Sequence, residues 1–385
     1  MNKPIYLDAA ATDGYKDSDD VVVDTIANAM KNYWRNPSSL YASDVKETVD
    51  KCRANIASFI NADSDEIIFT SGASESNNMA IRGFVDNVWT SRYKTTIVIS
   101  TKIEHKSIIE TIKSKSLVSY VRYCDTDKFG SVDYNKLENM LSEHVGQPIL
   151  VSIGMANNEI GTIQDILNIS NLVHRYNGVL HVDATQAFGH IPINVKEFGI
   201  DMMSASGHKI SPVLKGIGFL YKKRDINIKP LIYGSQENGL RGGTENTFGI
   251  IGLSKAVELC DISKENVNEM CKKRDYFIRL LKSKFGCKLN GCNNSRLPNN
   301  INVTFKQNIT GESLLYTLDM SGIAIGVGSA CNSHSIEPSY VLKAIGLSDE
   351  DAMRTIRISL PNDITYENID YAIDDIDKSI KLIEI

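Results

Sequence analysis

Seven short runs of apolar and β-branched residues, set between longer stretches with helical patterning, constrain the fold of this chain more than any other feature. Runs of this length bounded by turn residues are typical of buried strands. The runs are Ile67–Ser71, Thr96–Ser100, Val118–Tyr123, Ile149–Met155, Val179–Ala184, Met202–Ser206 and Ile217–Tyr221. Segments such as Ser43–Phe59 and Ile166–Tyr176 repeat apolar residues with a helical period. This alternation predicts an α/β fold class with a seven-stranded, mostly parallel sheet.

The length of the chain predicts two domains. It has 385 residues, of which 42% are hydrophobic, so it can bury a large core and exceeds the usual size of one domain. Helical patterning around Thr247–Lys284 leaves the sheet, and Asn300–Phe305 followed by Glu367–Glu384 indicates a smaller α+β domain. We expect the first residues to pack with the end of the chain. The predicted division is a large domain over residues 15–255 and a small domain formed by residues 1–14 and 256–385.

The charge and the first residues exclude two classes of partner. A formal net charge of −5 leaves no broad basic surface, so we expect no nucleic-acid partner. The segment Met1–Asp8 lacks the long apolar stretch of a signal peptide or a membrane span. We therefore expect a cytoplasmic protein without a membrane partner.

The cysteines form an odd set without the CxxC pairs of metal sites, which predicts reduced thiols and no metal site. They are Cys52, Cys124, Cys260, Cys271, Cys287, Cys292 and Cys331. Only Cys331, in Gly326–His334, stands among small residues with no large apolar neighbour to bury it, as expected for a reactive thiolate. A loop cysteine can also be idle.

Lys209, in Ser206-Gly207-His208-Lys209, suggests a carbonyl cofactor. A lysine amine can hold an aldehyde as a Schiff base, and a carboxylate at an earlier strand end can meet a protonated ring nitrogen. Asp183, with Gln186 three residues later, is placed for that second role, although an arginine partner would also explain a buried carboxylate. Lys209 and Asp183 together point to pyridoxal phosphate and an amino-acid substrate.

Other polar motifs follow the predicted strands, where open α/β sheets bind ligands. Ser71–Asn78 opens a helix and is a seat for phosphate or an ordinary serine cap. His105 can stack on a flat cofactor and exchange protons, or it is a structural histidine. Asn157 and Asn158 close a buried strand, either as loop caps or as ligand-binding amides.

Two more segments carry anion-binding groups. The Gly-rich stretch Arg241–Asn246 holds a guanidinium and the hydroxyl of Thr244, although its composition is also that of a plain loop. Arg357 alternates with apolar residues on a predicted strand. It can point into a cleft and bind a carboxylate, or lie at a strand edge.

The order and the residues of these motifs resemble those of the NifS/IscS-type cysteine desulfurases of the class V aminotransferase family, over nearly the whole chain. The motifs that carry the resemblance are Ser71–Asn78, Glu104-His105-Lys106, Asn157–Gly161, His181–Gln186, Arg241–Asn246, Gly328–Cys331 and Glu337-Pro338-Ser339. The resemblance implies a homodimer of pyridoxal phosphate fold type I that converts L-cysteine to alanine. The small domain would carry the catalytic cysteine loop.

The resemblance also implies a role for each candidate residue. Lys209 would carry the cofactor and act as base, His105 would stack over the ring, and Asp183 and Gln186 would bind the ring nitrogen and hydroxyl. The phosphate would be held by Ala73, Ser74, Ser206 and His208, with Thr244 reaching across from the other subunit. Asn158, beside the cofactor, and Arg357 would orient the substrate carboxylate. Cys331 would take the sulfur as a persulfide for an acceptor protein in iron–sulfur assembly or another thiolation.

Some positions depart from the family pattern, and they keep alternatives open. Ala9, Tyr41 and Asn238 replace residues common in the family, and Ile210–Lys215 after Lys209 is one residue longer. The alternatives are a selenocysteine lyase or another pyridoxal enzyme such as an aminotransferase, and a degenerate dimeric scaffold for a sulfur-transfer partner.

Overall fold

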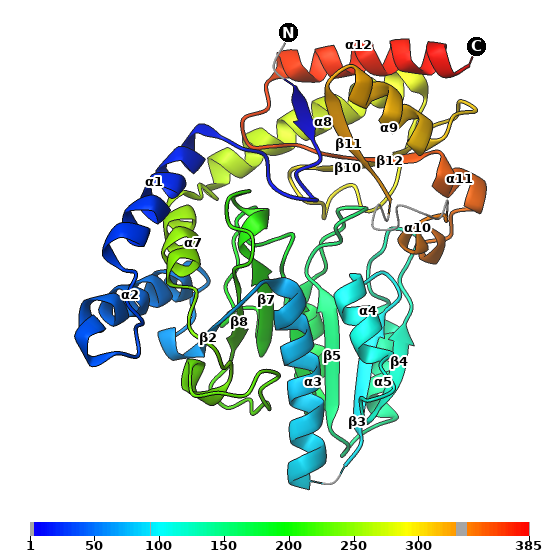
Figure 1. Cartoon of the computed structure of the whole chain (residues 1–385). Coiled ribbons are helices and arrows are strands. Elements are labelled where there is room, and N and C mark those ends of the chain that lie inside the picture. The colour runs from blue at the N-terminus through cyan, green and yellow to red at the C-terminus, as the bar shows by residue number, and fades with distance from the viewer. Residues whose placement is uncertain (1–3, 93, 329–336, 385) are drawn as a thin grey trace.

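The computed structural model describes residues 4–92, 94–328 and 337–384 and contains two sheets, one above the other in Figure 1. The larger sheet has seven strands in the order β2-β8-β7-β6-β5-β3-β4. The smaller has five strands in the order β1-β11-β12-β10-β9. Helices cover both faces of the larger sheet, as the alternating sequence pattern predicts.

The strands of the larger sheet coincide with the seven predicted runs to within one residue at each end. They are β2 (Ile67–Thr70), β3 (Thr96–Thr101), β4 (Ser119–Cys124), β5 (Ile149–Gly154), β6 (Val179–Asp183), β7 (Met202–Ser206) and β8 (Gly218–Lys222). Strand β8 runs antiparallel to both of its neighbours, and the other pairings are parallel. The prediction of a mostly parallel sheet is therefore confirmed.

Side chains alternate between the two faces of this sheet, as the period of a strand requires. In β3, Ile97 and Ile99 join the core on one face and Val98 joins the core on the other. The first core includes residues of α1 (Asp17–Asn32), α2 (Ser43–Phe59), α5 (Tyr134–Ser142), α6 (Ile166–Arg175) and α7 (Thr247–Leu259). The second includes residues of α3 (Ala73–Arg92) and α4 (Lys106–Ile112). Because both faces are covered, the strands read as continuous apolar runs.

The smaller sheet joins the two ends of the chain, as expected from the sequence. Its strands are β1 (Ile5–Leu7), β9 (Lys288–Leu289), β10 (Asn300–Thr304), β11 (Ile323–Val327) and β12 (Thr355–Ser359). Strand β1 pairs in parallel with β11, and the blue strand lies beside the orange one in Figure 1. The helices of this part are α8 (Lys264–Phe285), α9 (Gly311–Met320), α10 (Tyr340–Ala344), α11 (Asp349–Met353) and α12 (Tyr366–Ile383).

The predicted helical stretch from Thr247 to Lys284 is two helices with different partners. Residues 260–263 separate α7 from α8. Helix α7 packs on α1 and α2 of the larger sheet, whereas α8 packs on α12 and β10. Only α8 therefore leaves the larger sheet. The boundaries 15–255, 1–14 and 256–385 stay a prediction.

Residues 8–16, the N-terminal strap, connect the two sheets. The N–H groups of Ala9 and Ala10 donate to the carbonyl and the hydroxyl of Ser359 in β12, at 3.2 and 2.8 Å. Further along, the N–H of Asp13 donates to the carbonyl of His208 at 3.0 Å, just after β7. The strap thus bonds to both sheets on one side of the space between them.

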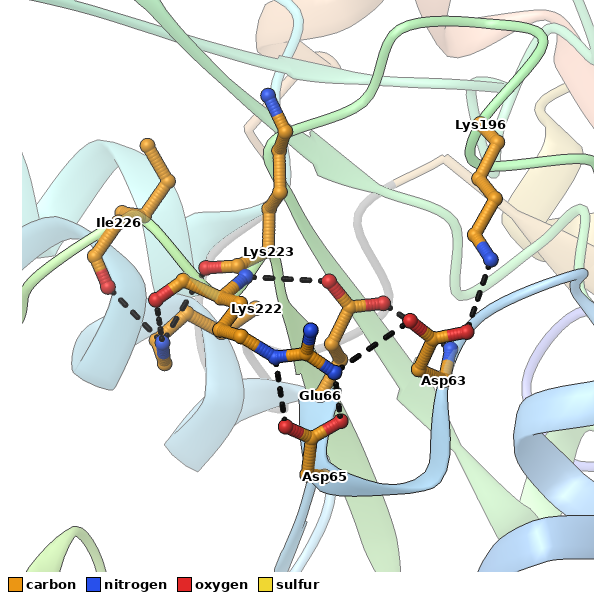
Figure 2. Close-up of polar contacts among 8 residues, drawn as sticks. Asp63, Asp65, Glu66, Lys196, Lys222, Lys223 and Ile226 are labelled. Carbon is orange, nitrogen blue, oxygen red and sulfur yellow. Dashed lines mark hydrogen bonds and ion pairs between the residues drawn. The ribbon is translucent and has the colours of Figure 1, made fainter.

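An ion-pair network joins the start of β2 to the end of its neighbour β8, far from the carboxyl end of β2 (Figure 2). Arg224 donates to both oxygens of Asp65 at 2.8 Å, and Lys196 pairs with Asp63 at 2.9 Å. The buried carboxylate of Glu66 accepts from the backbone N–H groups of Arg224 and Asp63. The outer pairs are exposed, so water screens them and they add little stability. This network orders the turn before β2.

None of the helices within the described ranges is long and apolar enough to cross a membrane.

Candidate active site

A cavity of about 650 Å³ lies where β2, β3, β5, β6 and β7 end, between the larger sheet and the N-terminal strap. This is the edge at which open parallel sheets bind ligands. The sequence-predicted residues that line it are Ala73, Ser74, His105, Asn158, Asp183, Gln186, Ser206, His208, Lys209 and Arg357. The fold therefore brings together side chains that are up to 284 residues apart, from Ala73 to Arg357.

Asp183 ends β6 as a buried carboxylate with neutral partners. Its Oδ2 accepts from the amide of Asn77 on α3 at 2.8 Å. Its Oδ1 accepts from the N–H of Thr185 at 3.0 Å and from the hydroxyl of the same residue. Across the described parts of the chain no arginine or lysine forms an ion pair with it, so the arginine alternative is not what the structure shows. A carboxylate held in this way can still accept from a cationic ligand group.

A buried histidine lies two positions before Asp183 on the same face of β6. The ring of His181 hydrogen-bonds with the hydroxyl of Ser152 in β5 at 2.9 Å and with that of Ser204 in β7 at 3.0 Å. Burial lowers the pKa of His181, because the charged ring would lose its hydration. The neutral ring joins three adjacent strands directly below the cavity.

Lys209 follows β7 in the short helical turn Gly207–Lys209. Its Nζ donates to the carbonyl oxygens of Ala10 and Ala11 in the strap, at 2.6 and 2.7 Å. Gln186 donates from Nε2 to the carbonyl of Ala10 at 3.0 Å. The strap therefore holds the amine at the cavity wall through carbonyl oxygens.

The predicted phosphate seat lies where β2 meets α3. Gly72 has φ of +144°, which only glycine adopts readily, and a Cβ there would lie 3.3 Å from the hydroxyl of Ser206. That hydroxyl bonds with His208 Nδ1 at 2.8 Å. Burial, aided by Lys209 and Lys215, lowers the pKa of His208 to about 4, so the ring is neutral. The N-terminal end of a 20-residue helix and these hydroxyl and imidazole groups suit an anion.

His105 has a structural role as well as a place in the cavity wall. Its Nδ1 accepts from the N–H of Ser107 at 3.1 Å and caps the start of α4. Because Nδ1 is the acceptor, a neutral ring carries its proton on Nε2. Desolvation lowers the pKa of His105, with Asp183 opposing that shift and Lys209 adding to it. The cap fixes the ring, and neither alternative drawn from the sequence excludes the other.

The two asparagines at the end of β5 do different work. Asn157 accepts from the N–H groups of Glu159 and Ile160 and donates to the carbonyl of Ile103, so it caps its own loop. Asn158 lines the cavity, and its carbonyl accepts from Arg357 Nη1 at 3.3 Å.

Arg357 is buried on β12, not at a sheet edge. Its Nη2 donates to Asp8 Oδ1 at 2.6 Å, and its Nε has no partner within the described residues. A Cβ on Gly326 would lie 2.8 Å from Nη2, so only glycine allows β11 to pass this pair. The guanidinium thus lines the cavity, and its buried Nε–H group lacks a hydrogen-bond partner among the described residues.

Glu104 is a cavity residue to which the sequence interpretation assigned no role. It is buried, and its two oxygens accept from the hydroxyl of Thr101 and the N–H of Gly154, both at 2.6 Å. It therefore ties the end of β3 to the end of β5, beside His105. Desolvation raises the pKa of Glu104 to about 7, against the two hydrogen bonds, and the charge of Asp183 adds to the rise. The pair Glu104-His105 after a predicted strand could have drawn attention to Glu104. The burial of its carboxyl group, which raises its pKa, could not be inferred from that pair.

Asn77 and Asp8 were also missed as single residues. Asn77 stood inside the predicted Ser71–Asn78 motif, and Asp8 stood in the first segment, but their partners Asp183 and Arg357 are distant in sequence.

Two predicted site residues, Thr244 and Cys331, are not among the described residues that line the cavity. Thr244 is exposed in its loop, and Arg241 beside it pairs with Glu75 of α3 at 2.9 Å. Cys331 lies outside the described residues. The other six cysteines are free thiols, and burial raises the pKa of Cys124, Cys260 and Cys287. High thiol pKa values keep these cysteines protonated and unreactive at neutral pH.

Among the departures from the family pattern, Ala9, Tyr41 and Asn238 lie outside the described cavity lining, whereas Lys215, at the end of the longer segment, is part of it. Ala9 is a buried residue of the strap, Tyr41 is exposed, and Asn238 takes φ of +55° in a turn, a conformation that asparagine tolerates. The longer segment after Lys209 forms a turn that buries Ile210 and Leu214 in the core.

Comparisons with known proteins agree with this geometry. A family model described as aminotransferase class-V matches residues 5–372. A curated relative from Dictyoglomus turgidum, named cysteine desulfurase IscS, is 40% identical over 388 aligned residues, covering 99% of this chain and 95% of that protein.

Solved structures have the same fold. One described as a NifS-like protein superposes with a TM-score of 0.88 at 32% identity, covering 98% of this chain and 100% of that one. Another, described as SspA in complex with cysteine, has a TM-score of 0.80 at 33% identity, covering 93% and 99%. The sheet and the cavity thus define a pyridoxal phosphate enzyme of fold type I. The chain belongs to the aminotransferase class-V family.

The residues of the cavity fit this cofactor. Lys209 offers an amine to its aldehyde, and Asp183, which pairs with no cation in the described ranges, offers a carboxylate to its ring nitrogen. The backbone around Gly72 and the pair Ser206–His208 offer donors to its phosphate. We keep the individual contacts as a proposal.

The raised pKa of Glu104 predicts a specific pH dependence of stability. The folded state holds this proton more tightly than the unfolded state, so unfolding becomes easier as the pH rises from about 4.5 to about 7. Glu104→Gln has no proton to lose at this position. We therefore expect the free energy of unfolding of the variant, minus that of the wild type, to rise across this pH window by up to about 3 kcal/mol.

Chemical denaturation at several pH values measures this difference. Glu110→Gln, an exposed glutamate on the neighbouring helix, is the matched control and should give a flat difference. A flat or falling difference for Glu104→Gln would show that the carboxyl is ionised at neutral pH.

Proposed function

We propose that this chain is a cysteine desulfurase that converts L-cysteine to L-alanine and passes the sulfur through its own Cys331 to an acceptor. The observation that carries the proposal is the convergence of Lys209, Asp183 and Arg357 on one cavity. A relative named cysteine desulfurase and a similar structure in complex with cysteine support this choice of substrate. Cys331 distinguishes it from an aminotransferase, which needs no thiol.

The substrate carboxylate would lie against Arg357 and Asn158. A guanidinium binds a carboxylate through paired N–H groups, and the buried Nε of Arg357 has no partner in the described structure. Asp8 pairs with Nη2 of the same guanidinium and fixes its orientation. The amino group of the substrate would then face Lys209 on the opposite wall.

Lys209 would move the proton at the substrate Cα. Bound pyridoxal phosphate supplies an electron sink, which makes that proton acidic and the Cβ–S bond breakable. The amine of Lys209 takes the proton, and His105, with its proton on Nε2, lies beside the same space for a later transfer. Glu104 and the cap of α4 keep His105 in place.

Cys331 would take the sulfur. Its thiolate attacks the substrate sulfur, an S–S bond forms as the Cβ–S bond breaks, and the substrate carbon gains a proton to become alanine. The enzyme keeps the sulfur as a persulfide. No external oxidant is needed, because the carbon is reduced as the transferred sulfur is oxidised.

We also propose that the working unit is a homodimer in the cytoplasm. Thr244 is exposed and lies outside the cavity of its own chain, as expected for a phosphate contact made in the partner subunit. An odd number of cysteines suits a reducing compartment. The acceptor would be a protein of iron–sulfur assembly or of another thiolation reaction.

Lys209→Ala should lose the borohydride-reducible link between protein and cofactor, together with all alanine production. Some cofactor should still be retained through the phosphate contacts. Mass spectrometry after reduction measures the link, and Lys106→Ala, another lysine of the cavity wall, should keep it. Alanine production by Lys209→Ala would refute the assignment, and keto-acid production by the wild type would indicate an aminotransferase instead.

Thr244→Ala should weaken cofactor retention by about ten- to a hundredfold, as loss of one hydrogen bond to a charged group predicts. Ser235→Ala, which removes an exposed hydroxyl from the same loop, is the control. The decisive sample is a heterodimer of one Lys209→Ala chain and one Thr244→Ala chain.

If Thr244 acts across the interface, the intact Lys209 of that heterodimer receives the intact Thr244 of its partner. Its reducible cofactor should then be retained as in the wild type. Weak retention in this heterodimer would place Thr244 in the site of its own chain, and unchanged retention in the Thr244→Ala homodimer would remove it from the site.

Cys331→Ser should bind cofactor and change its visible spectrum on addition of cysteine, yet form neither persulfide nor alanine at a useful rate. Mass spectrometry after a single exposure to cysteine should find the added sulfur on Cys331 of the wild type. Cys292→Ser is the matched control, because Cys292 is a half-buried loop thiol. Added sulfur on another cysteine, with full activity in Cys331→Ser, would overturn the mechanism but leave the cofactor assignment intact.

A further inference from the structure

Three consecutive carbonyl groups around the cofactor lysine are each held by a different donor. The carbonyl of His208 accepts from the N–H of Asp13 at 3.0 Å. The carbonyl of Lys209 accepts from His190 Nε2 at 3.1 Å, and that of Ile210 accepts from Lys16 Nζ at 3.0 Å. The backbone that carries the amine is therefore fixed from behind, on the side away from the cavity.

Two of these donors, Asp13 and Lys16, also contact each other. Lys16 Nζ also pairs with Asp13 Oδ2 at 3.0 Å, and the side chain of Asp13 is only 2% exposed. The N–H of Lys16 donates to Asp19 Oδ2 at 2.9 Å, and the other oxygen of Asp19 accepts from the hydroxyl of Ser211. The start of α1 is thereby joined to the turn that follows Lys209.

His190 connects the same backbone to the strand that carries Asp183. It follows β6 by seven residues, and its N–H donates to the carbonyl of Ala187 at 3.0 Å. A carbonyl oxygen can only accept, so Nε2 must carry the proton in this contact. Burial lowers the pKa of His190, which keeps the ring neutral.

We propose that His190 and the Asp13–Lys16 pair are positioning residues for Lys209. Neither Lys16 nor His190 lines the active-site cavity; both line a separate cavity of about 190 Å³ behind it. They act through the backbone, by fixing the origin of a flexible four-carbon side chain and so reducing the positions open to Nζ. This inference rests on the proposed role of Lys209 as the cofactor lysine.

The experiment is a double-mutant cycle on cofactor binding. His190→Leu removes the donor, and His190→Gln keeps an N–H close to the position of Nε2. Cofactor-free protein is titrated with pyridoxal phosphate, with Lys209 intact and with Lys209→Ala. With Lys209 intact, His190→Leu should weaken binding and slow formation of the reducible link by about three- to tenfold, the value of one hydrogen bond.

With Lys209→Ala, the same change should alter binding by less than about twofold, because the phosphate contacts are untouched. His190→Gln should recover most of the loss. Equal losses in both backgrounds, or no recovery by glutamine, would overturn the positioning role and leave only a structural one. A reducible link in Lys209→Ala itself would instead refute the proposed function.

Lys16→Met tests the second donor against a matched lysine. Lys273 lines the same rear cavity and donates to the carbonyl of Ile364 at 2.6 Å, but it does not contact the Lys209 segment. Lys16→Met should slow link formation with Lys209 intact, and Lys273→Met should not. Thermal unfolding of both variants serves as the control for folding, and equal rates of link formation would remove Lys16 from the proposal.

Discussion

The carboxyl ends of parallel strands meet at one edge of a sheet, and the rest of this structure depends on that constraint. Each right-handed crossover returns the chain to the same direction, so the residue after each strand reaches the same space. Asp183, Ser206 and His105 come from three such ends. The helices that begin there add N–H groups to the same edge. A site for an anionic, aromatic aldehyde follows from the topology and the residues placed at those ends.

The second wall of the cavity comes from the smaller sheet and the N-terminal strap. Arg357 reaches the cavity from β12 and is held by Asp8, at the other end of the chain. The strap then meets the amine of Lys209 through two carbonyl oxygens and its backbone through Asp13. The arginine proposed to bind the substrate and the lysine proposed to bind the cofactor are therefore both held by one continuous segment, from Asp8 to Lys16. A movement of the smaller sheet would therefore move the carbonyl groups that accept from Lys209.

Ionisable groups in and below the cavity wall favour their neutral forms where desolvation dominates. His181 and His208 are neutral, Glu104 has a raised pKa, and Asp183 lies at the cavity surface where a ligand can meet its charge. Desolvation is the largest cause at His181, His208 and Glu104, and the charge of Asp183 opposes it only at His181. Asp183, Lys209 and Arg357 are among the charged residues that line the cavity.

The sequence by itself determined the strands and the class of fold, and ten of the site residues predicted from it line the cavity. Strands buried on both faces are apolar along their whole length, and the chemistry of Lys209, Asp183 and Arg357 is legible in residue type and order. The tertiary structure alone decided which partners these groups have. It divided 247–284 into α7 and α8, which pack on different sheets, made Asn157 a loop cap, paired Arg357 with Asp8 and buried Glu104. Hydrogen bonds and desolvation depend on distances between residues far apart in the chain, and no local pattern contains those distances.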